Sequence, residues 1–364
     1  MKVAILNIYQ GMVERGAEIL VDNVASGLAQ DFEITIFAGG KSPKKPYKTV
    51  VLPVWNLSVD VSRSVILRIL HKFYLDPYPL EVFWFTLLCI PRLIKGKFDV
   101  VISINGFWQL ILLRLLKIIT GVKIISTGFA GVGRDAYWNS KLTTDGFIGM
   151  TNFVARWAAK INPKVKIFAI GGGVDFKRFT PVGPKAEVGL EKPVVLCVSA
   201  LVPYKRVNLA IKAVSKLGKG LPVGRQGSLL VIGDGPEKKN LEKLGKKLLG
   251  ERRFKILKVP YSEIDKYYRA CDVFTLPSED SEAFGIVYLE AMAAGIPVVA
   301  PNDEVRDEVV NGAGVLVNVE NIEEYAEGLK LVLEKKWEDL LYKQAAKFSW
   351  DKIVEKYRQM LRTT

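Results

Sequence analysis

The residues best suited to charge chemistry lie in the second half of the chain. Lys205 and Arg206 form a basic pair soon after an apolar run, and Glu282 and Glu290 stand eight positions apart further along. Fixed cations bind anions such as phosphate. The pattern therefore indicates a site for a phosphorylated ligand. The alternatives are a solvated charged pair for the two basic residues and an ordinary surface glutamate for Glu290.

The sequence around Phe284-Gly285 predicts the start of a helix. The free N–H groups of a helix N-terminus form a natural site for a diphosphate, and Gly285 would allow a phosphate to approach closely. We expect Phe284, Gly285 and Ile286 to line this site. Eight residues of helix rise roughly 12 Å. On that geometry, Glu282 and Glu290 would reach opposite ends of one extended ligand.

A Gly-rich turn, Gly233-Asp234-Gly235, follows the next apolar run after the basic pair. Glycine permits close contact between backbone and ligand, so Gly233 and Gly235 are candidate phosphate contacts. A tight turn without any ligand uses the same residues, and this alternative stays open.

Short apolar runs alternate with helical patterns in both halves of the chain, which is typical of doubly wound parallel sheets. The strands expected in the first half cover residues 3–8, 32–37, 99–104, 123–126, 147–150 and 165–170. Those expected in the second half cover residues 194–198, 229–232, 254–257, 273–276, 298–300 and 315–317. Glycines 171–173 and the Pro- and Gly-containing run 180–191 predict a linker. We therefore expect two Rossmann-like α/β domains, residues 1–171 and 172–349, with helix 350–364 joining the first.

The composition is that of a globular protein, with 49% hydrophobic and 25% charged residues. The formal charge of +14 favours anionic partners. The basic residues are scattered and no recognition module is present, so nucleic acid is not expected. Three distant cysteines give no zinc spacing and favour a reduced, cytoplasmic environment. No signal peptide and no apolar run of about 20 residues appears in the sequence.

Together, the segments around Lys205, around Gly233 and between residues 277 and 299 resemble glycosyltransferase family 4, whose members have the two-domain GT-B fold. The resemblance implies that the domain of residues 1–171 binds the acceptor and that the domain of residues 172–349 binds the nucleotide-sugar. The last segment matches that family's Glu-x7-Glu motif. Residues 11–18, with Gly16, and residues 172–179 agree more weakly.

The resemblance implies specific roles for these residues. Glu290 is expected on the ribose hydroxyls of a nucleotide-sugar and Glu282 near the donor sugar. Lys205 and Arg206 are expected at the leaving diphosphate. The remaining donor contacts would come from Phe284, Gly285, Ile286, Gly233, Gly235 and Gly16.

The chain departs from the family pattern in two places. Ala200 stands where the family commonly has an arginine, and no histidine follows the strand at residues 123–126. Arg134 and Asp135 are candidate acceptor contacts instead, although Asp135 could equally stabilise a turn. His71 is the only histidine and lies outside every motif, so we expect a structural or surface role for it.

The function that the resemblance implies is retaining transfer of a hexosyl unit from a nucleoside-diphosphate sugar to an acceptor hydroxyl. The acceptor would be a carbohydrate or lipid-linked, in polysaccharide or glycolipid assembly at the cell surface. No cofactor is expected, and no metal, because no Asp-x-Asp pair lies beside the donor motifs. The alternatives are a GT-B-fold sugar-nucleotide epimerase and a non-catalytic nucleotide-sugar-binding protein.

Residues 62–74 predict an amphipathic helix with an apolar stripe and basic residues beside it. Basic amphipathic helices bind anionic membrane surfaces, so we expect peripheral contact with the inner face of the cell membrane. The alternative is a helix whose apolar stripe packs on the protein core.

Overall fold

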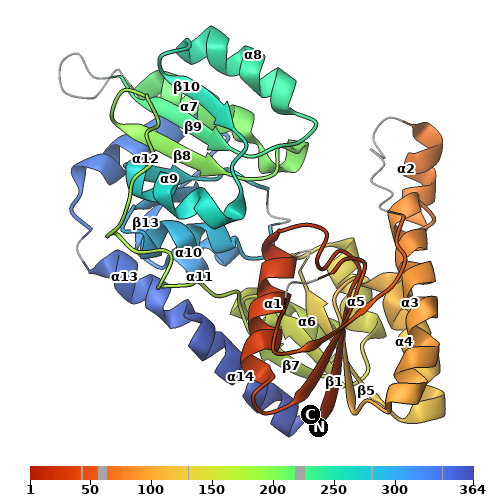
Figure 1. Cartoon of the computed structure of the whole chain (residues 1–364). Helices are drawn as coiled ribbons and strands as arrows, with labels where there is room; N and C mark the ends of the chain where they lie inside the picture. The colour runs from red at the N-terminus through yellow and green to blue at the C-terminus, as the bar shows by residue number, and fades with distance from the viewer. Residues whose placement is uncertain (42–43, 56–63, 130, 218–225, 280–281, 338) are drawn as a thin grey trace. The chain divides into compact units, whose positions relative to one another are not determined.

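The computed structural model describes residues 1–41, 44–55, 64–129, 131–217, 226–279, 282–337 and 339–364. The chain divides into two compact units (Figure 1). Unit 1 consists of Met1–Gly172 and Trp350–Thr364, and unit 2 consists of Gly173–Ser349. Each unit is built on its own parallel sheet.

The sheet of unit 1 has seven strands in the order β3-β2-β1-β4-β5-β6-β7, all of them parallel. The strands are β1 (Lys2–Asn7), β2 (Glu33–Ala38), β3 (Lys48–Val51), β4 (Val100–Ser103), β5 (Lys123–Gly128), β6 (Gly146–Gly149) and β7 (Lys166–Ala169). The central strands are buried almost throughout, because helices cover both faces of the sheet. Burial on both faces explains why their sequences are continuous apolar runs.

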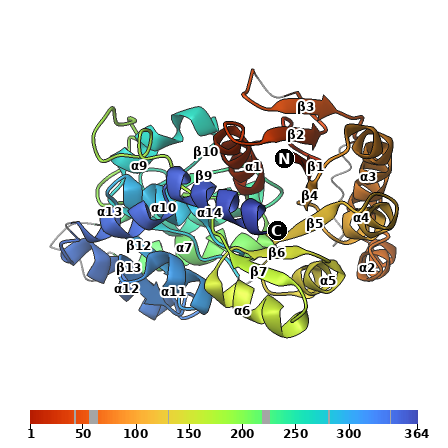
Figure 2. The ribbon, with the colours of Figure 1, turned by 90° about the horizontal axis from the view of Figure 1, so that it is seen from below.

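The helices of unit 1 lie on both faces of this sheet, with α1 and α14 on one face and α3 and α4 on the other (Figure 2). They are α1 (Gly16–Leu28), α2 (Val65–Lys72), α3 (Pro77–Gly96), α4 (Phe107–Thr120), α5 (Arg134–Leu142), α6 (Asn152–Ile161) and α14 (Trp350–Thr363). Helix α14 packs along α1, and Arg358 donates to Asp31 at 2.7 Å. The C-terminal helix is therefore part of unit 1.

The sheet of unit 2 has six parallel strands in the order β10-β9-β8-β11-β12-β13. The strands are β8 (Val194–Val198), β9 (Ser228–Ile232), β10 (Phe254–Leu257), β11 (Val273–Thr275), β12 (Val298–Pro301) and β13 (Gly314–Val317). The helices are α7 (Val207–Leu217), α8 (Lys238–Leu249), α9 (Ile264–Ala270), α10 (Ile286–Ala293), α11 (Glu304–Val310), α12 (Ile322–Glu334) and α13 (Leu340–Ala345). Polar side chains at the carboxyl ends of these strands share one edge of the sheet.

Each predicted strand is present within two residues of its expected ends, which confirms the predicted class of two parallel α/β domains. Strand β3 was not predicted, because it has four residues and is only partly buried at the sheet edge. The run 180–191 is not a free linker. It packs on unit 2, where Arg269 donates to the carbonyl of Pro184 at 2.8 Å. Among the described residues, no helix is sufficiently long and apolar to span a bilayer.

Candidate active site

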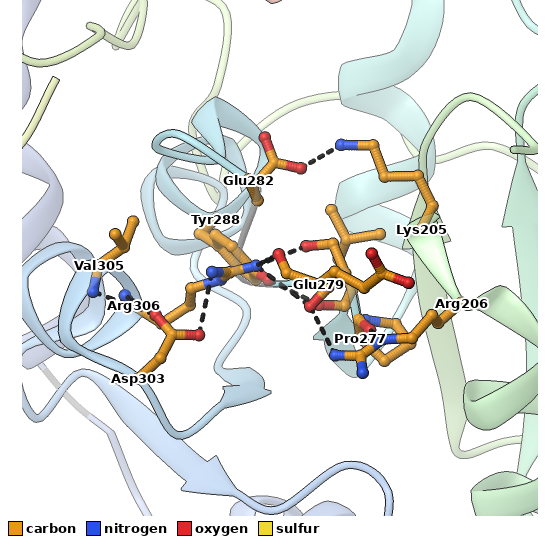
Figure 3. A network of polar contacts seen from close by, with 11 residues as sticks. Lys205, Arg206, Pro277, Glu279, Glu282, Tyr288, Asp303, Val305 and Arg306 are labelled. Carbon is orange, nitrogen blue, oxygen red and sulfur yellow. Dashed lines mark hydrogen bonds and ion pairs between the residues drawn. The ribbon is translucent and has the colours of Figure 1, made fainter. Parts of the chain in front are cut away.

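The turn after β8 brings a lysine and a glutamate together from distant parts of the sequence. A short 3-10 turn, Pro203–Lys205, follows the strand, and the Nζ of Lys205 forms an ion pair with the carboxylate of Glu282 (Figure 3). Both side chains are largely buried. The two candidate residues nearest to the expected phosphates and donor sugar therefore lie in direct contact. Residues 280 and 281, within the same motif, lie outside the described residues.

Arg206, also a candidate for the leaving diphosphate, contacts the protein backbone. Its Nε donates to the carbonyl of Pro277 at 2.8 Å, and one terminal nitrogen donates to the carbonyl of Ser278 at 2.9 Å. The other terminal nitrogen pairs with Glu320 at 2.9 Å. The alternative that Arg206 is a free, solvated cation is therefore wrong. The guanidinium holds the segment that precedes Glu282.

A second arginine, Arg306 in α11, holds the same segment and was missed from the sequence. It is fully buried and donates to the carbonyl and hydroxyl of Ser278 at 3.2 and 2.9 Å, and to the carbonyl of Glu279 at 2.7 Å. Its other terminal nitrogen lies 2.9 Å from Asp303, which also caps α11 (Figure 3). A single arginine within a helix gives no signal in the sequence, so only the fold could reveal it.

Helix α10 begins at Ile286, as the sequence predicts, and Gly285 is its N-cap residue. Gly285 has φ +82°, and a Cβ there would lie 2.6 Å from the ring of Tyr288, so the position requires glycine. Phe284 is buried with its ring edge-on to Phe348 at 5.5 Å, and Ile286 is half-buried. Glu282 lies before the helix, as expected, but residues 282–285 are not helical, so the rise of eight helical residues expected between Glu282 and Glu290 is wrong.

Glu290 lies inside unit 2 and is only 2% exposed, so the surface-glutamate alternative is wrong. Its two carboxylate oxygens accept hydrogen bonds from the hydroxyls of Tyr261 at 2.7 Å and Tyr268 at 2.8 Å. Burial raises the pKa of Glu290, and the two tyrosine hydrogen bonds and Arg178 oppose that rise. Arg178 itself lies over the Tyr261 ring at 4.0 Å. Glu290 is therefore held in a fixed orientation by an aromatic and cationic shell.

The Gly-rich turn packs against the backbone of the basic turn. A Cβ at Gly233 would lie 1.9 Å from the carbonyl oxygen of Ser199, and one at Gly235 would lie 2.5 Å from that of Leu201. The N–H of Leu201 donates to the carbonyl of Asp234 at 2.9 Å. Close packing of the two turns is therefore a sufficient reason for both glycines. Their contact with phosphate stays a prediction.

The remaining candidates lie in unit 1, where Arg134 and Asp135 begin α5. The hydroxyl of Tyr74 donates to Asp135 at 2.6 Å, and the guanidinium of Arg134 lies over the Tyr74 ring at 4.5 Å. Arg134 also contacts Nε2 of His71 at 3.2 Å, and Nδ1 of His71 lies 3.2 Å from Asp76. His71 is exposed, yet it stands within a polar cluster.

This cluster forms part of the wall of a cavity of about 550 Å³, lined by His71, Tyr74, Asp76 and Asp135 among others. Gly16, the exposed first residue of α1, was expected at the donor; the neighbouring residues Arg15, Ala17 and Glu18 line this same cavity. Among the described residues, no three or more His, Cys, Asp or Glu side chains are grouped in a way that could hold a metal ion. Metal independence itself stays a prediction.

Residues 184–349 match the model of a family described as glycosyl transferases group 1. Over 160 residues the chain is 32% identical to the GDP-mannose-dependent alpha-(1-6)-phosphatidylinositol monomannoside mannosyltransferase of Mycolicibacterium smegmatis, covering 40% of this chain and 41% of that protein. The chain spans about half the length of the curated relatives that it matches.

Two solved structures share the architecture of the whole chain. Sucrose-phosphate synthase from Thermosynechococcus elongatus has a TM-score of 0.78 at 18% identity, covering 100% of this chain and 98% of that one. Anabaena Alr3699/HepE in complex with UDP-glucose has a TM-score of 0.76 at 17% identity, covering 100% of both chains. These likenesses confirm the predicted GT-B fold class. Residues 184–349 thus match the glycosyl transferases of group 1, the kind of family that the motifs in this part of the chain indicated.

Proposed function

We propose that this chain transfers a hexosyl unit from a nucleoside-diphosphate sugar to an acceptor hydroxyl, with retention at the anomeric carbon. The observation that carries the proposal is the Lys205–Glu282 pair beside the start of α10, within the residues that match the family model. The relative from M. smegmatis is named for a GDP-mannose donor, and the HepE structure contains UDP-glucose. Both names support a nucleotide-sugar as the donor here.

The ion pair suggests how the site accepts its donor. Lys205 and Glu282 neutralise each other in the structure, which lowers the cost of burying either charge. A bound diphosphate would take over Lys205 as its counter-ion and free the carboxylate of Glu282 for hydroxyls of the donor sugar. Lys205 and the N–H groups at the start of α10 would then stabilise the charge that develops on the leaving diphosphate.

The transfer step itself needs little covalent chemistry from the protein. The bond between the anomeric carbon and the diphosphate oxygen breaks, and a bond to the acceptor oxygen forms on the same face of the sugar. The acceptor hydroxyl proton passes to the leaving phosphate. No protein nucleophile takes part in this scheme, so binding, orientation and electrostatic stabilisation supply the rate enhancement.

Mass spectrometry of reaction products tests the proposal, using a panel of nucleotide-sugars with lipid-linked and soluble acceptors. The expected result is an acceptor whose mass rises by one hexose. Release of an altered sugar-nucleotide without acceptor would instead identify an epimerase. Tight donor binding with no consumption of donor across the panel would identify a non-catalytic binding protein.

We also propose that the acceptor is met at an anionic membrane surface, in glycolipid or polysaccharide assembly, which implies a cytoplasmic enzyme bound peripherally. No residue of α2 is fully buried, and Ile66 and Phe73 are 69% and 66% exposed. The alternative, in which this stripe packs on the core, is therefore wrong for most of it, although Leu70 is half-buried. Arg68 and Lys72 lie beside the exposed residues, as suits an anionic lipid surface. Residues 62 and 63 lie outside the described residues.

Flotation with vesicles tests this membrane contact. Co-migration with vesicles that contain acidic lipids is expected at low salt, and its loss is expected at high salt because the charge attraction is screened. The double variant Ile66→Ser and Phe73→Ser should reduce co-migration. Leu340→Ser, at an exposed position in unit 2, is the control and should leave co-migration unchanged. Absence of co-migration at low salt would reject the membrane contact.

A further inference from the structure

Residues 172–179, which agree weakly with the family pattern, place an arginine at the interior of unit 2. The N–H groups of Arg178 and Phe179 donate to the carbonyl of Asp175 at 3.2 and 2.8 Å, which closes a tight turn. Phe179 is 1% exposed, so it anchors the turn in the core. The side chain of Arg178 is 23% exposed, but its Nε and Nη2 are buried. The turn therefore fixes the guanidinium of Arg178 inside the unit.

Aromatic rings, rather than hydrogen bonds, hold these two nitrogens of Arg178. The Cζ of Arg178 lies 4.0 Å from the centroid of the Tyr261 ring and 4.8 Å from that of Phe179. Among the described residues, neither Nε nor Nη2 has a hydrogen-bond partner, and Oδ1 of Asp265 lies 3.7 Å from Nε. A cation over an aromatic face is attracted by the ring, most strongly where water is excluded. The charge of Arg178 is thus fixed in place by stacking.

A second arginine beside the same turn makes the contacts of a structural residue. Arg269 is 6% exposed and forms an ion pair with Asp265. It also donates to the carbonyls of Pro184 and Arg178 at 2.8 and 3.2 Å. Arg269 therefore holds the chain through hydrogen bonds, whereas the buried charge of Arg178 is left to act on another group.

Arg178 reaches Glu290 through the ring of Tyr261. The hydroxyl of Tyr261 donates to Oε1 of Glu290 at 2.7 Å, and the guanidinium of Arg178 lies over the same ring. The other tyrosine on Glu290, Tyr268, is fully buried and lies edge-on to Phe179 at 5.6 Å, so it needs no such support. Tyr261 is only half-buried and belongs to a short 3-10 turn. Its orientation therefore depends on the contact with Arg178.

The charge of Arg178 also acts on the buried carboxylate of Glu290. Burial raises the pKa of Glu290, and the hydrogen bonds from Tyr261 and Tyr268 and the charge of Arg178 oppose that rise. An ionised carboxylate has about four acceptor positions, so Glu290 can accept from ligand hydroxyls as well as from the two tyrosines. Protonation of Glu290 would remove part of that capacity. The ionised form is thus the one suited to a hydroxyl-bearing ligand.

The other elements that pack on α10 supply no substitute for this cation. Strands β11 and β12 carry no charged side chain. The cations of α9, α11 and α13 are each paired with a carboxylate nearby: Lys266 with Glu263, Arg269 with Asp265, Arg306 with Asp303 and Lys343 with Asp339. Helix α11 also carries the carboxylates of Glu304, Asp307 and Glu308. Among the described residues, Arg178 is the charged side chain that acts on Glu290.

We propose that Arg178 is a positioning residue for Glu290, because its guanidinium holds the Tyr261 hydroxyl on the carboxylate and supplies positive charge beside it. The inference rests on the proposed function, in which the ligand of Glu290 is the nucleotide-sugar. Arg178 itself makes no contact with the donor in this scheme. Its loss should therefore weaken donor binding and leave kcat at saturating donor nearly unchanged.

Carbon-13 NMR of the Glu290 carboxyl tests the assignment without any donor, on the full chain labelled at glutamate. The resonance is identified by its absence from Glu290→Gln. In Arg178→Gln the titration midpoint of Glu290 should rise, because burial is then opposed by the tyrosines alone. Arg178→Lys keeps a cation and should restore the midpoint. Lys177→Gln removes an exposed positive charge from the same turn and, as the control, should leave the midpoint unchanged.

Donor binding gives the second measurement, by calorimetry with GDP-mannose and UDP-glucose. Arg178→Gln should bind the preferred donor about tenfold more weakly, a loss of the size of one hydrogen bond to a charged group. As pH falls, binding should be lost at a higher pH in Arg178→Gln than in the wild-type chain, since Glu290 takes up its proton earlier. Arg178→Gln and Tyr261→Phe together should cost less than the two separate losses added, because both act through one carboxylate.

Three results would overturn the inference: an unchanged midpoint of Glu290 in Arg178→Gln, donor binding equal to that of the wild-type chain, or additive losses with Tyr261→Phe. If circular dichroism shows that Arg178→Gln does not fold, Arg178→Met takes its place, since it fills the space between the rings without a charge. A wild-type chain that binds no nucleotide-sugar would remove the proposed function instead. A raised midpoint of Glu290 in the same samples would still support the action of Arg178 on Glu290.

Discussion

Lys205 and Glu282 in unit 2 neutralise each other, whereas Glu18 in unit 1 is buried with one carboxylate oxygen unpartnered. Around the first pair, Arg206 and Arg306 are also occupied, each holding backbone carbonyls of residues 277–279. Around Glu18, the neighbouring amide oxygens are unpartnered too. The two regions thus differ at their carboxylates, because that of Glu282 is paired with a cation whereas one oxygen of Glu18 has no hydrogen-bond partner.

The pairing of Lys205 with Glu282 bears on how this region could bind an anion. A charged ligand can displace an internal counter-ion, so a site for diphosphate remains stable when empty if its cation is paired. We expect variants in unit 2 to act on stability and turnover, and variants in unit 1 to act on acceptor recognition.

The largest effect is expected from Arg306→Ala. Removing this buried guanidinium leaves Asp303 without its cation and the carbonyls of Ser278 and Glu279 without their donor. Breaking a buried pair in this way costs about 3–5 kcal/mol. Hydrogen exchange of peptides from unit 2 should show this loss of protection. Arg252→Ala, an exposed arginine in the same unit, is the control. A loss below about 1 kcal/mol, which is less than a broken buried pair should cost, would mean that the segment does not depend on Arg306.

The next effect is on turnover. Lys205→Ala removes the cation proposed for the leaving diphosphate, where loss of one such contact costs roughly 2.7–4 kcal/mol. We expect kcat to fall about 100- to 1000-fold, with a smaller change in KM, because the transition state gains most from the charge. Arg206→Ala should cost less, since that guanidinium holds backbone carbonyls. Steady-state kinetics of both variants measure these effects. A larger loss of kcat for Arg206→Ala than for Lys205→Ala would reverse this assignment.

The two glutamates of the motif should separate in their effects. Glu290→Gln should chiefly weaken donor binding and Glu282→Ala should chiefly lower turnover, each by about tenfold or more, as expected for hydrogen bonds to a charged group. Calorimetry with the nucleotide-sugar and initial-rate kinetics measure the two effects. Glu334→Gln, on the exposed side of α12, is the matched control. Near wild-type behaviour of both motif variants would remove these residues from the proposed site.

A weaker effect concerns pH. Burial raises the pKa of Glu290 above its ordinary value of 4.5, so the folded chain holds a proton that the unfolded chain has lost. The contribution of Glu290 to stability is therefore lost as pH rises from 4.5 through the folded pKa. Thermal unfolding of Glu290→Gln should lack this part of the pH dependence. Identical pH profiles for the variant and the wild-type chain would show that Glu290 has the same pKa folded and unfolded.

The smallest expected effect is that of a chelator. Lys205 and the start of α10 are proposed to stabilise the diphosphate without a metal ion, so transfer should continue in excess EDTA. Product formation measured with and without the chelator decides the matter. If EDTA abolished transfer and magnesium restored it, the electrostatic role assigned to Lys205 would need a metal partner.

Much of the architecture could be predicted because burial on both faces of a parallel sheet leaves a direct mark on the sequence. Strands such as β8 and β10 are continuous apolar runs, and the prediction located both exactly as the structure has them. Strand β3 lacks that mark because it lies at an edge and is only partly buried. The helix start at Gly285 was likewise predictable, since a glycine at φ +82° before an apolar run is a local feature.

The sequence by itself determined the two-domain α/β architecture, the family motifs and the residues most suited to bind a diphosphate. Only the tertiary structure decided the partners of those residues. Lys205 meets Glu282 across 77 positions, and Arg306 meets Ser278 across 28. The cavity of unit 1 joins Asn7, Glu18 and Asn139 in the same way. The physical reason is that parallel strands bring their carboxyl ends to one edge of a sheet, where residues far apart in sequence become neighbours.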